Sequence, residues 1–264
     1  MNSKYIINII PYENDYLFKQ WGIQSIYMNN FMTYEFGKIF PSYLTSKKIL
    51  MIGRGDSKKK RFQIGIEAME YIKEEIHEIK MLIISDLVRL LFIKVLINNL
   101  NLETFIKFKD YTSTPEIYFR KVSLNLFPSI SEAFPLVLCE TKIFGIPSIL
   151  LGLDYTSISE GGTIIIYDDS PESLAKVSIE ILESNKNLFE LGKKARNSMK
   201  IFNNDSLLIK WIKLIFNIYY SDKYYKDFKD KNNKISEIKA INILNRQINL
   251  LKKRIHVFEK INIK

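Results

Sequence analysis

Short apolar runs alternate with amphipathic helical stretches along most of this chain, and this alternation limits the possible folds more than any other feature. The expected strands cover residues 5–10, 25–28, 48–52, 81–85, 105–108, 124–127, 148–151 and 163–167. The expected helices cover residues 13–21, 61–79, 87–99, 115–122, 170–182, 185–202 and 205–220, with a further helix beginning at Pro135. Regular β–α alternation with short connections predicts an α/β domain with a Rossmann-like, doubly wound parallel sheet.

Composition indicates the cellular compartment of such a domain and the kinds of site that it could contain. The chain has 264 residues, 47% of them hydrophobic, which is enough for a substantial core. Cys139 is the one cysteine, so no intrachain disulfide can form and a reducing, cytoplasmic compartment is expected. His77 and His256 lie in different segments, so no metal site is predicted. The apolar segment 81–97 contains three charged residues and is not predicted to span a membrane.

The C-terminal segment differs from the rest of the chain. Residues 222–264 contain 12 Lys and Arg against 5 Asp and Glu. This excess favours an acidic partner, such as an anionic membrane, nucleic acid or a phosphorylated ligand, and would equally suit a solubilising helical face. Apolar residues alternate three and four apart from Ile241 to Phe258, as in a heptad seam. We therefore expect a helical tail that packs on its own domain or forms a coiled coil in a homodimer.

Two glutamates eight positions apart, Glu132 and Glu140, flank a predicted helix start. Pro135 suits the first turn of that helix, because a missing N–H costs nothing there. The N–H groups at the helix start, including those of Leu136 and Val137, are expected to be free and to favour an anion. Each carboxylate could accept two hydrogen bonds from a sugar or ribose diol.

A basic loop follows the predicted strand at residues 48–52. Its sequence, Gly53-Arg54-Gly55-Asp56, is neither a dinucleotide fingerprint nor a Walker loop. Glycine lets a ligand approach the backbone closely, and an arginine with a nearby lysine suits a diphosphate. The lysines at 58–60 would equally suit a solvated surface.

Together these motifs resemble the donor site of retaining GT-B glycosyltransferases of family four. In that family a Glu, seven residues and a second Glu grip a nucleotide sugar, and a Gly-Arg with a later Lys binds the diphosphate. The matching residues here are Glu132 to Glu140, Gly145-Ile146-Pro147, Gly53-Arg54 and Lys60-Arg61-Phe62. The resemblance runs from about residue 47 to 202 and implies the C-terminal domain of the GT-B fold.

The resemblance also implies a role for individual residues. Arg54 and Lys60, or Lys59 in place of Lys60, would stabilise charge on the leaving diphosphate. Glu132 would hold donor sugar hydroxyls and Glu140 the ribose diol. Further donor contacts are implied for Gly53, Tyr111, Thr112, Phe134, Leu136 and Val137.

The implied reaction is transfer of a sugar from a nucleotide diphosphate sugar to a glycan or lipid acceptor, with retention and without a metal or other cofactor. No nucleophile is assigned. Residues 1–46 are interpreted as a remnant of an N-terminal Rossmann-like domain, 47–220 as the donor-binding domain and 221–264 as the basic tail. Most of the acceptor-binding domain is therefore expected to be missing, and the chain to be a fragment or half of a split enzyme.

Other functions fit parts of the sequence. A decayed, inactive transferase domain could act as an interaction protein that dimerises through the seam from Ile241 to Phe258. Nucleic-acid binding is not favoured, because Tyr224, Tyr225 and Phe228 precede the main charge cluster rather than interleave with it. The carboxylates of a GT-B-like sugar epimerase are not recognisable.

Overall fold

The chain divides into two compact units, residues 1–204 and 205–264. The computed structural model describes residues 6–9, 17, 19–22, 25–54, 59–86, 91–130, 132–152 and 158–221, with side chains as far as residue 216. The described residues of the second unit belong to one helix, α8 (Asn204–Ser221). The basic tail and the seam from Ile241 to Phe258 lie outside the described residues, so the predicted tail, coiled coil and domain boundaries stay predictions.

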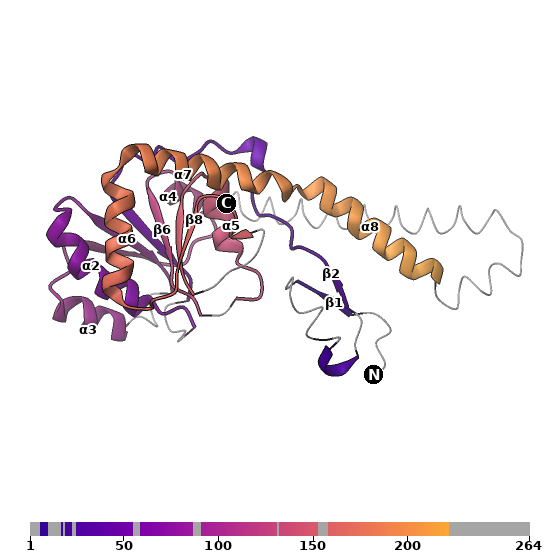
Figure 1. Cartoon of the computed structure of the whole chain (residues 1–264), viewed down its shortest axis with the longest axis horizontal. Helices are drawn as coiled ribbons and strands as arrows, with labels where there is room; N and C mark the ends of the chain where they lie inside the picture. Colours follow the sequence, from indigo (N-terminus) through magenta and orange to yellow (C-terminus); the bar gives the residue numbers. More distant parts are fainter. Residues whose placement is uncertain are drawn as a thin grey trace, which may run out of the picture. The chain divides into compact units, whose positions relative to one another are not determined.

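Six parallel strands form the central sheet of the first unit (Figure 1). In chain order they are β3 (Lys48–Ile52), β4 (Lys80–Ile84), β5 (Ile106–Lys109), β6 (Leu124–Phe127), β7 (Ser148–Leu151) and β8 (Thr163–Ile166). In space they lie in the order β5-β4-β3-β6-β7-β8. This is the order of a doubly wound fold and confirms the predicted Rossmann-like sheet.

Six α-helices connect or follow these strands. They are α2 (Phe62–Glu75), α3 (Leu91–Asn99), α4 (Glu116–Phe119), α5 (Leu136–Ile143), α6 (Pro171–Glu183) and α7 (Asn185–Ser198). Two short 3-10 helices, η1 (Phe36–Lys38) and η4 (Met199–Ile201), also lie in this unit.

Apolar side chains cover both faces of the sheet, as expected for buried parallel strands. On β3, Ile49 and Met51 face a core that also contains side chains of α2, α3 and α6. Leu50 points the other way, into a cluster with Phe119 of α4 and Phe144 just after α5. This burial on both faces explains why the strands could be recognised as short, continuous apolar runs.

The N-terminal segment forms a separate two-stranded sheet. β1 (Ile6–Asn8) and β2 (Ser25–Tyr27) pair in parallel, and the Met28 N–H donates to the Asn8 carbonyl oxygen at 3.0 Å. Leu17 and residues 19–21 between the two strands are helical. The predicted β–α–β order is therefore present in the described residues.

Several predicted helices are shorter than expected, for local reasons. The helix predicted at 115–122 is only the four residues of α4, because the N–H groups that would continue it bond elsewhere. The Lys121 N–H donates to the Tyr118 carbonyl oxygen at 2.9 Å in a tight turn, and the Ser123 N–H donates to the Lys48 carbonyl oxygen of β3 at 2.8 Å. The carbonyl oxygens of Lys121 and Val122 accept hydrogen bonds from the hydroxyls of Ser46 and Ser42, both at 2.7 Å. Pro135 is the N-cap of α5 rather than a first-turn residue, with φ −81° and ψ 72°.

Candidate functional site

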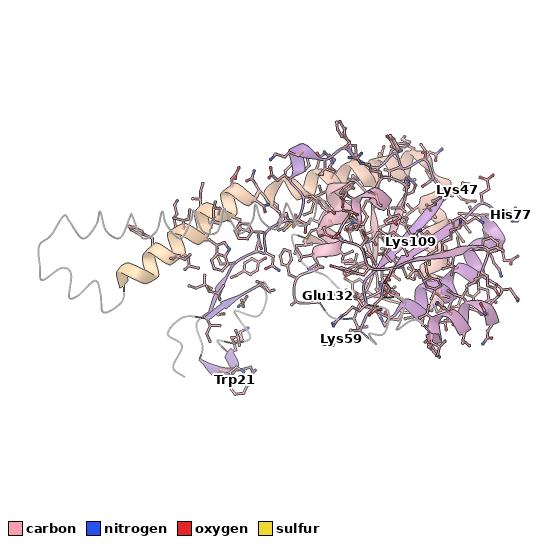
Figure 2. The ribbon with its side chains drawn as sticks, turned by 180° about the vertical axis from the view of Figure 1, so that it is seen from behind. Trp21, Lys47, Lys59, His77, Lys109 and Glu132 are labelled. Carbon is pink, nitrogen blue, oxygen red and sulfur yellow. The ribbon has the colours of Figure 1, made fainter. Side chains whose placement is uncertain are left out.

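The direction of winding reverses between β3 and β6, which makes this position the switch point of the sheet. Ligands of doubly wound sheets bind at this point, outside the carboxyl ends of the strands. Gly53 and Arg54 follow β3, and the segment leading to Glu132 follows β6. Figure 2 shows Glu132 and Lys59 at one end of the sheet and Lys47, which precedes β3, at the other.

Lys60 lies at this switch point of the sheet. Its ammonium group forms an ion pair with the Glu132 carboxylate, and both side chains are more than four-fifths buried. The same ammonium lies 5.3 Å from the centre of the Phe127 ring, at the end of β6. The Ile130 N–H donates to the Lys59 carbonyl oxygen at 2.8 Å, which ties the two loops together.

Gly53 makes room for the Lys60 side chain. A Cβ atom at Gly53 would lie 3.1 Å from Lys60 Cε, and the glycine has φ +152°, which a residue with a side chain rarely adopts. The Gly53 N–H donates to the Ile84 carbonyl oxygen at 3.1 Å, so the turn after β3 is also held to β4. The glycine thus lets Lys60 lie across the end of the sheet.

Arg61 organises the same end of the sheet and was not predicted. Its guanidinium donates to the carbonyl oxygens of Pro128 at 2.7 Å and Leu151 at 3.3 Å, after β6 and on β7. It also pairs with the Asp169 carboxylate, which follows β8, at 2.5 Å. Arg61 has a left-handed backbone, φ 47°, which positions Lys60 before α2 begins. Two features of the sequence could have pointed to Arg61. It stands next to Lys60, and an aspartate, Asp169, follows a predicted strand.

Glu140 lies on α5 and contacts the segment that precedes the sheet. The Thr33 hydroxyl donates to its carboxylate at 2.5 Å, and the adjacent Tyr34 hydroxyl donates to Glu116 of α4 at 2.8 Å. Burial raises the pKa of Glu140, the hydrogen bond from Thr33 opposes that rise, and the nearby charge of Glu116 adds to it. Burial and Glu116 also raise the pKa of Tyr34. Thr33, Tyr34 and Glu116 were not predicted from the sequence.

Lys142, two residues nearer the end of α5 than Glu140, is fully buried and was also missed. Its ammonium donates to the carbonyl oxygens of Ile158 and Glu160, in the segment before β8. Burial lowers the pKa of Lys142 to about 8, against weaker opposing effects of Cys139 and Glu160. The lysine therefore anchors the connection between β7 and β8 from inside the domain.

A family model of glycosyl transferases, group 1, matches residues 35–198, which is more than half of the chain and includes all six strands of the central sheet. The chain belongs to the group 1 glycosyl transferases. A search of curated proteins gave no match.

Solved structures of glycosyltransferases share the fold of this group 1 glycosyl transferase. S. aureus TarM, solved with Fondaparinux, alpha-GlcNAc-glycerol and UDP, is 22% identical with a TM-score of 0.69, over 79% of this chain and 43% of that one. The pneumococcal O-GlcNAc transferase GtfA, with UDP and GlcNAc, is 18% identical with a TM-score of 0.70, over 82% and 45%. Sucrose-phosphate synthase from Thermosynechococcus elongatus is 20% identical with a TM-score of 0.70, over 84% and 60%. This chain thus spans 43 to 60% of their lengths.

The other predicted site residues of this group 1 glycosyl transferase differ in how exposed their side chains are. Arg54 is exposed at the end of β3, and Tyr111 is 82% exposed. The Thr112 hydroxyl lies 3.2 Å from that of Thr114, whereas the Phe134 side chain is buried in the core.

One expectation about the start of α5 is wrong. The Leu136 N–H, predicted to be free, donates to the Phe134 carbonyl oxygen at 2.9 Å, because the turn at Pro135 folds the chain back on itself. Val137 remains at the first turn of α5.

Two absences concern the described residues alone, namely membrane-spanning helices and metal-binding groups. Within the described ranges, no helix combines the length and apolarity needed to cross a bilayer. Among the same residues, no group of three or more His, Cys, Asp or Glu is arranged to hold a metal ion.

Proposed function

We propose that this chain is the donor-binding part of a retaining glycosyltransferase, which moves a hexose from a nucleoside diphosphate sugar to a glycan or lipid acceptor. The observation that carries the proposal is the Lys60–Glu132 pair at the switch point between β3 and β6. An ammonium beside a carboxylate offers one group for a phosphate and one for sugar hydroxyls, within one small site. The family membership and the nucleotides named with the TarM and GtfA structures support UDP as the first donor base to test.

In the proposed reaction, the bond between the sugar C1 and the diphosphate oxygen breaks, the acceptor oxygen bonds to C1 on the same face, and the proton of the acceptor hydroxyl passes to the departing diphosphate. Negative charge grows on the departing diphosphate. Lys60 is held near that position by Gly53 and Phe127, and the exposed Arg54 lies next to Gly53 in the chain. Charge placed in advance of the reaction stabilises the transition state without reorganisation. We assign no nucleophile and no cofactor.

Glu132 and Glu140 take different parts of the donor in this proposal. Binding of a diphosphate at Lys60 leaves Glu132 to accept hydrogen bonds from sugar hydroxyls. Glu140 accepts one bond from Thr33 at present, and its other lone pairs can accept from the ribose diol. Tyr111 and Thr112, after β5, would lie beside the base.

Titration calorimetry tests the proposal directly. The full chain is titrated with a panel of UDP- and GDP-sugars, in parallel with Arg54→Ala and Glu140→Ala variants. The proposal predicts heat with at least one donor and its loss in both variants. No heat with any member of the panel would rule out a donor-binding role.

A further inference from the structure

A second concave surface lies at the amino end of the sheet, far from the Lys60–Glu132 pair. It is a groove of about 330 Å³. Its lining includes Lys48, Lys80, Leu82, Lys107, Lys121 and Val122. β3 separates the two ends of the sheet by about 16 Å, from the usual rise per strand residue. Figure 2 places Lys47 and Glu132 at these opposite ends, so the groove is not part of the donor site.

The parallel register puts the groove lysines on one face of the sheet. Lys48 lies beside Lys80, and Leu82 lies beside Lys107, so all four side chains leave the sheet in the same direction. The helix on that face is α4, which has only four residues. Because α4 is so short, it leaves the amino ends of β4 and β5 open on this side.

The surface around the groove is strongly positive. The segments that border it, residues 40–48, 78–80, 103–109 and 118–123, hold seven Lys and Arg and only Glu78 and Glu103 as carboxylates. Lys80 donates to the Thr104 carbonyl oxygen at 3.0 Å and lies over the Phe105 ring. Within the described residues, none of the four groove lysines forms an ion pair.

Exposed apolar side chains adjoin these cations. Phe40 is 74% exposed and Tyr43 is 72% exposed. They lie beside the groove, because Ser42, which stands between them, and Ser46, which follows them, donate hydrogen bonds to the carbonyl oxygens of residues 122 and 121. The Arg120 guanidinium is 6.0 Å from the Phe40 ring. Aromatic rings among lysines and arginines are typical of surfaces that enter the headgroup region of a membrane.

We propose that this surface, formed by the groove lysines with Phe40 and Tyr43, docks the domain on an anionic lipid bilayer. The lysines would lie at the level of the headgroup phosphates and the two rings just below it. A soluble acidic partner would satisfy the lysines but leave both exposed rings in water, so a bilayer fits the whole surface better. The donor site, at the other end of the sheet, would then stay open to solution.

The test compares two triple variants of the full chain, which carry the same basic tail and lose the same charge. The surface variant has Lys48→Gln, Lys107→Gln and Lys121→Gln. The control has Lys176→Gln, Lys186→Gln and Lys193→Gln, at exposed positions on α6 and α7. Co-sedimentation is measured with vesicles of phosphatidylcholine alone and mixed with phosphatidylglycerol. We expect the surface variant to bind the mixed vesicles at least about tenfold more weakly, since each lysine near a membrane contributes appreciably.

A second variant tests the aromatic rings without any change of charge. Phe40→Ser with Tyr43→Ser should also weaken binding to the mixed vesicles, while circular dichroism shows an intact fold. Equal binding by the surface and control triple variants would overturn the proposal. So would binding of poly-glutamate that depends on the lysines while the ring variant binds vesicles normally, because that result indicates an acidic protein partner.

Discussion

The two ends of the central sheet hold their cations in opposite ways. At the carboxyl end, Lys60 pairs with Glu132, and Arg61 pairs with Asp169 and two carbonyl oxygens. At the amino end, Lys48 and Lys107 are exposed, and neither forms an ion pair within the described residues. A cation whose position is fixed by partners is suited to bind a small anion at a defined position. Exposed lysines are suited to contact an extended anionic surface. The same residue types therefore build a set of ion pairs at one end and an exposed basic surface at the other.

The largest effect is expected from removing a cation that has partners. Arg61→Met leaves the Pro128 and Leu151 carbonyl oxygens and the Asp169 carboxylate without their donor, and should lower the free energy of unfolding by about 3–4 kcal/mol. Lys48→Met, at the other end, should change it by no more than about 0.5 kcal/mol. Urea denaturation of both variants measures this difference. Equal losses of unfolding free energy would contradict the contrast between the two ends of the sheet.

Lys142 shows what burial does to a cation that has only carbonyl partners. Because its folded pKa is about 8 against 10.5 for the ordinary group, the unfolded chain binds more protons between these values. Stability should therefore rise with pH across this window, by roughly 3 kcal/mol relative to a Lys142→Met variant. Measuring both proteins at pH 7 and pH 10 cancels other titrations. A difference that does not change with pH would show that Lys142 is neutral or solvated.

Glu132→Gln sharpens the comparison at the donor site itself. The variant removes the carboxylate that competes with a diphosphate for Lys60, so UDP alone should bind about fivefold more tightly. The advantage of a UDP-sugar over UDP should shrink, because the variant loses an acceptor for sugar hydroxyls. Competition binding against a fluorescent UDP analogue measures both values. Weaker UDP binding by the variant would mean that the carboxylate does not face the phosphates.

The smallest effect concerns the pH dependence of Glu140. Since the folded pKa is raised above the ordinary value of 4.5, this residue stabilises the fold at low pH and loses that contribution as pH rises through the folded pKa. Compared with Glu140→Gln, which keeps the acceptor for Thr33, the wild-type chain should become relatively less stable from pH 4 to pH 7. Parallel denaturation curves at these two values measure the change, and the opposite slope would contradict the assigned burial.

Much of the fold could be predicted because its signals are local. Strands buried on both faces appear as continuous apolar runs, and Ser170 and Pro171 mark the start of α6 in the sequence as in the structure. The end of α4 could not be predicted, because the chain leaves the helix where the Ser123 N–H bonds to the Lys48 carbonyl oxygen of β3, more than 70 residues away.

The site was predictable only where a motif lies within one loop. Lys60 and Glu132 were predicted in this way, and the structure pairs them, whereas their role in donor binding stays a prediction. The main charged partner of Arg61 is Asp169, which is 108 residues away in the sequence. In the sequence Lys142 looks like a solvent-exposed helix lysine, because its carbonyl partners lie in the segment before β8. Partners so distant leave no trace in a single sequence.

The central claim is that cations at the carboxyl end of the sheet grip a diphosphate. It is tested most directly by titrating UDP into the Arg54→Met, Lys60→Met double variant and into a matched Lys176→Met, Lys193→Met control. Loss of two charge-assisted contacts predicts a dissociation constant roughly a hundredfold higher for the first, and an unchanged one for the control. Equal dissociation constants for the two variants and the wild-type chain would contradict the account.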